Sequence, residues 1–178
     1  NIPLLSFIVL SARCRDCGEK ISWQYPTTEF LTGVVFALVG NYFFLPYNSA
    51  SWILTAYYLA IFSLLAVIFI YDLKYMEIPM LILWIGIAVT IAYFLTYDWQ
   101  NFNLAVSILD LKIVSGILGG LVAFMFFFVL AAYSKETWMG YGDAYIGMLA
   151  GLIVGWPNII WTLMLSFAVG AIISIGLI

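Results

Sequence analysis

The chain has 178 residues, of which 66% are hydrophobic and 8% are charged, and its formal net charge is -3. Soluble domains carry roughly 25% charged residues, so this composition excludes an ordinary water-soluble protein. Disorder is also excluded, because it requires low hydrophobicity and high charge. The small net charge gives no reason to expect nucleic-acid binding. The sequence contains no histidine, which removes Ser–His and Cys–His catalytic pairs.

The N-terminal part of the chain differs from the rest. Residues 2–10 are apolar but too few to cross a bilayer, so we expect an interfacial or packing segment there. Residues 11–25 are the most polar stretch and contain both cysteines. We predict that residues 1–25 form a short cytoplasmic segment and that residues 26–178 form a transmembrane bundle.

Polar turns divide the rest of the chain into apolar runs. These runs are continuous and do not alternate, which favours helices over the strands of a β-barrel. A membrane-spanning helix uses about 20 residues. We therefore predict an all-α fold, a polytopic membrane helical bundle with about six transmembrane helices, at residues 28–45, 51–71, 78–95, 113–133, 144–154 and 159–178. Thr27 or Thr28 is expected to cap the first of these helices.

Basic residues gather on one side of the predicted bundle. With six crossings, one side receives five of them and the other side receives Lys112; the five are Arg13, Arg15, Lys20, Lys74 and Lys135. Because positive charge in short loops marks the cytoplasmic side, we predict that the N-terminal segment is cytoplasmic. Cys14 and Cys17 then lie in a reducing compartment, where we expect no stable disulfide.

Small residues recur at a spacing of four along three of the predicted helices. Such faces let helix backbones approach closely in lipid. We predict helix packing, and no chemistry, for these positions: Gly116 with Gly120, then Gly147, Gly151 and Gly155, and finally Ser166, Gly170 and Ser174.

Two aspartates are the main candidates for chemistry. Asp72 ends the second predicted span and Asp143 begins the fifth, so an even number of crossings separates them and they lie on the same membrane face. Acidic residues near the hydrocarbon are costly and are therefore functional candidates. Two carboxyl groups held close together share one proton. One of them then activates water and the other donates a hydrogen bond to a carbonyl, which predicts aspartic-type hydrolysis.

Neighbouring residues support or compete with this interpretation. Gly140 and Gly142 directly precede Asp143, and glycine permits a positive φ and a close backbone approach. An extended peptide is expected to lie against that loop. Lys74 is either an interface anchor or a charge that favours the ionised form of Asp72. Glu77 is expected to anchor the interface, and Asp98 and Asp110 are expected to be solvated loop acids on the outer side.

Two rival functions remain open. One is a proton-coupled transporter or relay subunit, because intramembrane acids also serve such proteins. Relay acids usually lie deep within a span, whereas both aspartates here fall at span ends. The other rival is a non-catalytic membrane assembly partner.

The strongest signal is a set of motifs in order along the chain. Gly140-Tyr141-Gly142-Asp143 resembles the G-x-G-D motif of intramembrane aspartyl proteases. Asp72 followed by Ile78-Pro79, together with Arg13-Cys14-Arg15-Asp16-Cys17-Gly18, is similar to the type IV prepilin peptidases. That resemblance implies an aspartic endopeptidase in which Asp72 and Asp143 are catalytic. It also implies removal of the basic leader of type IV prepilins or type II secretion pseudopilins, at the cytoplasmic face of the bacterial inner membrane.

The resemblance also implies cofactors and partners. Many members of the family N-methylate the new N-terminus with S-adenosylmethionine, and Glu29 matches a glutamate sometimes linked to that activity. Proteolysis requires no cofactor. Zinc at Cys14 and Cys17 would need a second C-x-x-C pair upstream, since a structural zinc site uses four ligands. The expected partners are the prepilin helix and the lipid bilayer, and the oligomeric state is left open. Tyr145 stands where the family often has lysine.

Overall fold

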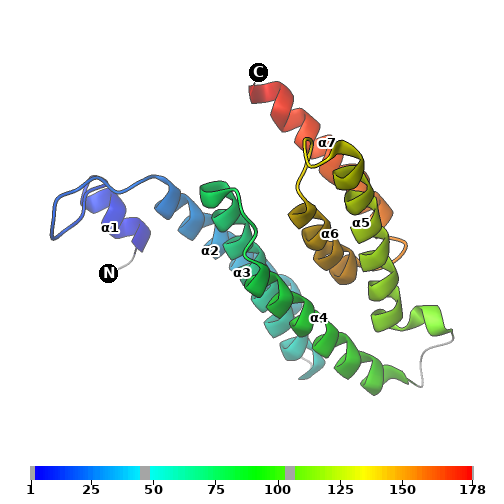
Figure 1. The fold of residues 1–178 in the computed structure, drawn as a ribbon. Helices are drawn as coiled ribbons and strands as arrows, with labels where there is room; N and C mark the ends of the chain where they lie inside the picture. The colour runs from blue at the N-terminus through cyan, green and yellow to red at the C-terminus, as the bar shows by residue number, and fades with distance from the viewer. Residues whose placement is uncertain (1–2, 45–48, 103–106, 178) are drawn as a thin grey trace. The chain divides into compact units, whose positions relative to one another are not determined.

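The structure is a computed structural model that describes residues 3–44, 49–102 and 107–177. Within these ranges the fold is built of helices and contains no strand, as predicted (Figure 1). The elements in chain order are α1 Pro3–Val9, α2 Gln24–Phe44, α3 Ser49–Tyr75, α4 Met80–Asn101, η2 Ile108–Asp110, α5 Lys112–Ser134, α6 Tyr141–Val154 and α7 Ile159–Leu177.

Each predicted span coincides with one of the helices α2 to α7. Among the described residues, four stretches are both long and apolar enough to cross a membrane: Trp52–Tyr75, Met80–Asn101, Lys112–Ser134 and Ile159–Gly176. The α6 helix is apolar but has 14 residues, which corresponds to about 21 Å at 1.5 Å per residue. The hydrocarbon core is about 30 Å thick, so α6 is shorter than this core.

The chain divides into two compact units, Asn1–Ala66 and Val67–Ile178. In the first unit, Phe7 of α1 packs edge-to-face on Trp23, with 5.1 Å between ring centroids. Phe43 of α2 stacks on Tyr58 of α3 at 4.6 Å. These aromatic contacts stabilise the packing of segments that have few polar side chains to form hydrogen bonds with one another.

The first unit also corrects one prediction. The α2 helix begins at Gln24, four residues before the predicted start of the span. Pro26 lies in its first turn, where proline is tolerated because the first backbone N–H groups have no partner within the helix. The hydroxyl groups of Thr27 and Thr28 donate to carbonyl oxygens four and three residues earlier. Neither threonine is therefore a cap.

In the second unit, α5, α6 and α7 lie side by side (Figure 1), and glycines form the contact between α5 and α6. A Cβ atom built on Gly119 would lie 2.5 Å from the carbonyl oxygen of Gly151. One built on Gly116 would lie 2.8 Å from the carbonyl oxygen of Leu152. The predicted packing of these two helices is confirmed. At Gly170 on α7 an added Cβ would meet none of the described residues within 4 Å, so packing at this position stays a prediction.

Asp98 also differs from its prediction. The α4 helix runs six residues beyond the predicted span, so Asp98 lies on a helix and is 9% exposed. Its Oδ1 and Oδ2 accept hydrogen bonds from the backbone N–H groups of Lys112 and Ile113, at 2.9 and 2.8 Å. A carboxylate in this position satisfies two donors at the start of α5 and matches the helix dipole. Asp110, in contrast, is exposed as expected and accepts from Ser107.

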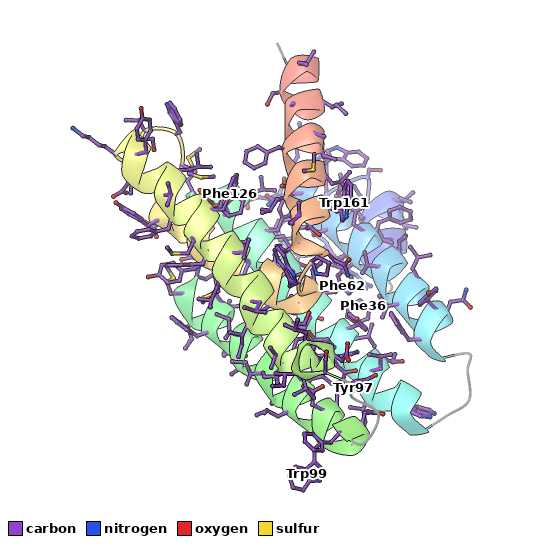
Figure 2. All side chains as sticks on the ribbon, turned by 90° about the vertical axis from the view of Figure 1, so that its right-hand side faces the viewer. Phe36, Phe62, Tyr97, Trp99, Phe126 and Trp161 are labelled. Carbon is purple, nitrogen blue, oxygen red and sulfur yellow. The ribbon has the colours of Figure 1, made fainter. Side chains whose placement is uncertain are left out.

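This end of α4 has the aromatic character of a membrane interface. Trp99 projects outward and is 87% exposed, and Tyr97 lies close to it on the same helix (Figure 2). The ammonium group of Lys112 sits 3.8 Å from the centroid of the Tyr97 ring. Tryptophan and tyrosine are enriched where a helix leaves the hydrocarbon. The N-terminus of α4 lies at the candidate site.

Candidate active site

Asp72 lies on the last turn of α3, where the chain leaves the helix. The backbone N–H of Met76 donates to the carbonyl oxygen of Asp72 at 2.8 Å. Met76 itself has φ 54°, the left-handed conformation that commonly ends a helix. The Asp72 side chain is exposed. The short segment Glu77–Pro79 then leads into α4.

Asp143 lies in the first turn of α6, outside the four candidate spans. Its Oδ2 accepts a hydrogen bond from the N–H of Gly140 at 3.2 Å, and its own N–H donates to the carbonyl of Gly140 at 3.2 Å. The side chain is half-buried. Burial raises the pKa of Asp143 above its usual value, the hydrogen bond from Gly140 opposes this, and the nearby charge of Asp72 adds to the rise.

The segment after Asp72 packs directly against the start of α6. A Cβ atom on Gly142 would lie 2.5 Å from Cδ1 of Ile78 and 3.4 Å from its Cγ1. Gly142 is therefore explained by the approach of a side chain, and not by the approach of another backbone. Gly140 has φ -80° and ψ 160°, an extended conformation that does not require glycine. This contact brings the surroundings of the two aspartates together.

Both aspartates line one open cleft of about 450 Å³ within the second unit. The lining combines four carboxyl side chains with apolar groups and includes neither lysine nor arginine among the described residues; it consists of Asp72, Met76, Glu77, Ile78, Met80, Glu136, Gly140, Tyr141, Gly142 and Asp143. Lys74 is exposed, with its ammonium group 5.1 Å from the Tyr75 ring centroid. Its proposed effect on Asp72 stays a prediction.

The sequence analysis did not identify Glu136, and it expected Glu77 to anchor the membrane interface. Glu136 follows the C-terminus of α5, where Lys135 and Glu136 have φ 50° and 62°. Its backbone N–H donates to the carbonyl of Ala131 at 3.0 Å, which closes the end of the helix. The chain therefore turns toward the cleft at this point. The available signal was the position of Glu136, seven residues before Asp143 in the same polar loop.

Asp143 also borders a second cavity of about 250 Å³, partly open, between α5, α6 and α7. The lining is mostly apolar and consists of Phe127, Met139, Asp143, Ile146, Gly147, Ala150, Ile159, Thr162, Leu163 and Ser166. The hydroxyl group of Ser166 donates to the carbonyl oxygen of Leu163 on the same helix, and that of Thr162 donates to the carbonyl oxygen of Asn158, which directly precedes α7. These two hydroxyls therefore add little polarity to the cavity.

The cysteines lie in the first unit, on a tight turn. The N–H of Gly18 donates to the carbonyl of Cys14 at 3.1 Å, and Gly18 has φ 69°. Hydrogen bonds to the sulfur from the N–H groups of Cys17 and Asp16 lower the pKa of Cys14, which favours a thiolate. The described residues contain no group of three or more metal-ligating side chains, so this turn provides half of a tetrahedral site.

Glu29 is separate from the aspartates along the chain and lines another cavity. That cavity, about 360 Å³ within the first unit, is also lined by Arg13, Arg15, Cys14 and Tyr25. Glu29 is exposed, and its expected functional role stays a prediction.

Comparison with known proteins gives two family matches. Residues 1–43 match the bacterial peptidase A24 N-terminal domain, and residues 59–175 match the type IV leader peptidase family. No solved structure matches the chain.

Curated relatives named prepilin leader peptidase/N-methyltransferase come from several bacteria. The Aeromonas salmonicida (strain A449) protein is 32% identical over 100% of this chain and 57% of its own length. The Myxococcus xanthus (strain DK1622) protein is 29% identical over 98% and 48%. The Bacillus subtilis (strain 168) protein is 29% identical over 96% and 62%. The chain thus spans about half the length of the curated relatives it matches.

Proposed function

Because the chain belongs to the type IV leader peptidase family, we propose that it is an aspartic endopeptidase of the bacterial inner membrane. Its substrates are the basic leaders of type IV prepilins or type II secretion pseudopilins. The observation that supports this function most directly is that Asp72 and Asp143, 71 positions apart, line the same cleft. The family match is consistent with it.

The two carboxyl groups supply the acid and the base of peptide hydrolysis. We assign Asp143, whose pKa is raised by burial, the part of the acid, and Asp72 the part of the base. Asp72 removes a proton from water as the water oxygen bonds to the scissile carbonyl carbon, while Asp143 gives its proton to the carbonyl oxygen. When the C–N bond breaks, the proton on Asp72 moves to the leaving amine. The hydroxyl proton of the tetrahedral intermediate returns to Asp143, and both groups are restored.

We propose that the cleft faces the cytoplasm. Five of the six basic residues, including Lys74 and Lys135 near the cleft, fall on one side of the predicted topology, and Lys112 falls on the other. Backbone without hydrogen-bond partners cannot be exposed to lipid. The substrate helix therefore unwinds locally at the open, water-accessible cleft, where water is available for the reaction.

The direct test is cleavage of a prepilin fragment in detergent. Asp72→Asn and Asp143→Asn each remove one titrating oxygen with little change of shape, and each should abolish cleavage. Asp110→Asn, an exposed acid on η2, is the matched control and should cleave normally. Full cleavage by both aspartate variants contradicts the function. Proton uptake into liposomes that is lost in the same variants, without any cleavage, would favour the transporter.

Methyl transfer is a further part of the proposal. The named relatives are called N-methyltransferases, and the cavity in the first unit offers groups that fit S-adenosylmethionine. Arg13 suits its carboxylate, Glu29 its sulfonium charge and Tyr25 its adenine. The cofactor supplies an electrophilic methyl group. Glu29→Gln should weaken binding of S-adenosylmethionine in calorimetry and leave peptide cleavage intact; equal binding by both forms contradicts the assignment.

We propose zinc at Cys14 and Cys17 only where a second pair of cysteines completes the four ligands of the site. The lowered pKa of Cys14 supports its role as a thiolate ligand. Zinc content measured on the purified protein, with Cys14→Ser as comparison, tests this. Equal zinc content in the two proteins excludes the site.

A further inference from the structure

The first turn of α6 is held differently from the rest of that helix. From Gly147 onward, glycines let α6 pack closely on α5, as at Gly151, where an added Cβ would lie 2.9 Å from Cα of Gly120. Asp143 lies before this close contact, in the turn that begins at Tyr141. The position of its carboxyl group therefore depends on the side chains that hold the start of the helix.

Tyr145, two residues after Asp143, packs its ring against two other helices. Its ring centroid lies 5.4 Å from that of Phe124 on α5, with 60° between the ring planes. It lies 6.3 Å from that of Trp84 on α4, with 57° between the planes. Aromatic rings prefer offset or edge-on arrangements with centroids about 4.5–7 Å apart. One side chain of α6 thus contacts both α4 and α5.

The ring contacts continue from Tyr145 to the lining of the cleft. Phe124 stacks on Phe128, one turn further along α5, with centroids 5.5 Å apart, and the Phe128 centroid lies 5.4 Å from that of Tyr141. Tyr141 lines the cleft that contains both aspartates. Tyr141 and Tyr145 are four positions apart and share a face of α6. The α5 helix therefore holds α6 at two points, one before and one after Asp143.

Tyr145 is placed to act on the geometry of the cleft without being part of it. Among the described residues, Tyr145 is in the lining of neither the cleft nor the second cavity that Asp143 borders. Positions two apart on an α-helix face roughly opposite sides of it. Trp84 lies on α4, the helix that follows Asp72 along the chain. Its contact with Tyr145 therefore connects the two parts of the chain that carry the aspartates.

We propose that Tyr145 is a positioning residue: its ring, packed against α4 and α5, fixes the first turn of α6. It thereby sets the place of Asp143 relative to Asp72. The inference rests on the proposed function and adds to it the side chain that sets the geometry of the catalytic pair. Loss of the ring lowers kcat, because a misplacement of about 1 Å can cost roughly 100-fold in rate. The KM for the substrate changes little, because the groups that line the cleft are retained.

Cleavage of the prepilin fragment in detergent measures this effect, with kcat referred to the folded fraction from circular dichroism. Tyr145→Leu removes the ring and should lower kcat about tenfold to hundredfold, with KM within about twofold of wild type. Tyr145→Phe keeps the ring and should keep kcat within about twofold of wild type. The matched control is Phe126→Leu, which removes a ring of α5 that packs on Phe167 of α7 at 5.8 Å. This control should keep kcat.

A pair of cysteines measures the position of α6 without any cleavage. A Cβ atom on Gly142 would lie 3.6 Å from Cβ of Ile78, which fits the Cβ–Cβ separation of about 3.5–4.5 Å in a disulfide. The protein with Ile78→Cys and Gly142→Cys, and with serine replacing Cys14 and Cys17, should form this disulfide on mild oxidation. Maleimide labelling of the remaining thiols gives the rate. Adding Tyr145→Leu should slow disulfide formation several-fold, whereas adding Phe126→Leu should not.

The outcomes separate the inference from the function on which it rests. If the wild-type protein cleaves no fragment but Tyr145→Leu slows the disulfide, the proposed function fails and the positioning of α6 by Tyr145 is supported. If Tyr145→Leu keeps full kcat or the full rate of disulfide formation, the positioning role is refuted. A loss carried by KM alone refutes it as well, because it would place Tyr145 in contact with the substrate. An equal loss in Tyr145→Phe refutes it by assigning the effect to the hydroxyl group.

Discussion

The contact between α5 and α6 makes the sharpest prediction about stability. A Cβ atom on Gly151 would lie 2.6 Å from the carbonyl carbon of Gly119 and 2.9 Å from Cα of Gly120. Both are backbone atoms, which no rotamer change can move aside. An ordinary van der Waals contact begins at 3.4 Å, so Gly151→Ala forces the helices apart by about 0.8 Å. Such overpacking typically costs about 1–3 kcal/mol.

Gly170→Ala provides the matched control on α7. An added Cβ there lies more than 4 Å from every atom that the structure describes outside its own helix turn, so this variant shows the effect of the Gly-to-Ala change without a clash. Alanine alone favours a helix over glycine by roughly 0.5–1 kcal/mol. That gain is common to both variants. The difference between their free energies of unfolding therefore isolates the clash, and we expect Gly151→Ala to be less stable by about 1–3 kcal/mol.

Equilibrium unfolding in mixed detergent micelles measures this difference. The same variant should also lose peptidase activity, because α6 carries Asp143 and a misplacement of about 1 Å can cost roughly 100-fold in rate. Gly170→Ala should keep its activity. Equal unfolding midpoints for the two variants would show that the α5–α6 contact is looser than the structure describes, and the argument for a rigid α6 would fail.

Three further predictions concern the ends of the helices. Asp98→Ala leaves two backbone donors of α5 without their acceptor and should lower the free energy of unfolding by about 2 kcal/mol. The control Asp110→Ala should lower it by less than about 0.5 kcal/mol. Equal losses for the two variants in chemical denaturation would contradict the capping role of Asp98. Because the pKa of Asp143 is raised above 3.8 in the folded state, the fold gains stability from the protonated form, and this stability is lost as pH rises through the raised pKa. The pH dependence of unfolding in Asp143→Asn should lack that loss, and identical profiles refute it. Gly142→Ala should reduce kcat/KM a few-fold, because the added Cβ contacts Cδ1 of Ile78. Ile78→Val removes Cδ1 and should restore kcat/KM in the double variant. A double variant with the same kcat/KM as Gly142→Ala would argue against this contact.

Much of the fold follows from composition and periodicity alone. Continuous apolar runs have no stable arrangement in water, and a helix is the form that satisfies every backbone group within one segment. The helices α2 to α7 therefore appear where the runs are. The glycine spacing on α5 and α6 was also readable, because positions four apart share a helix face. The parity of crossings put Asp72 and Asp143 on one side before any coordinates were known.

Other features depended on contacts that local sequence does not encode. From the sequence Asp98 is predicted to be a loop acid. In the structure α4 extends past Asp98, and the first backbone N–H groups of α5 donate to its carboxylate. Gly170 has the same spacing pattern as Gly151, but a Cβ added there would meet none of the described residues within 4 Å, because a spacing defines a face and not a partner. Glu136 joins the cleft since α5 ends in two left-handed residues. The sequence thus determined which segments are helices and which acids share a side. Tertiary packing decided which side chains are in contact, because contacts between distant segments depend on the positions of whole helices.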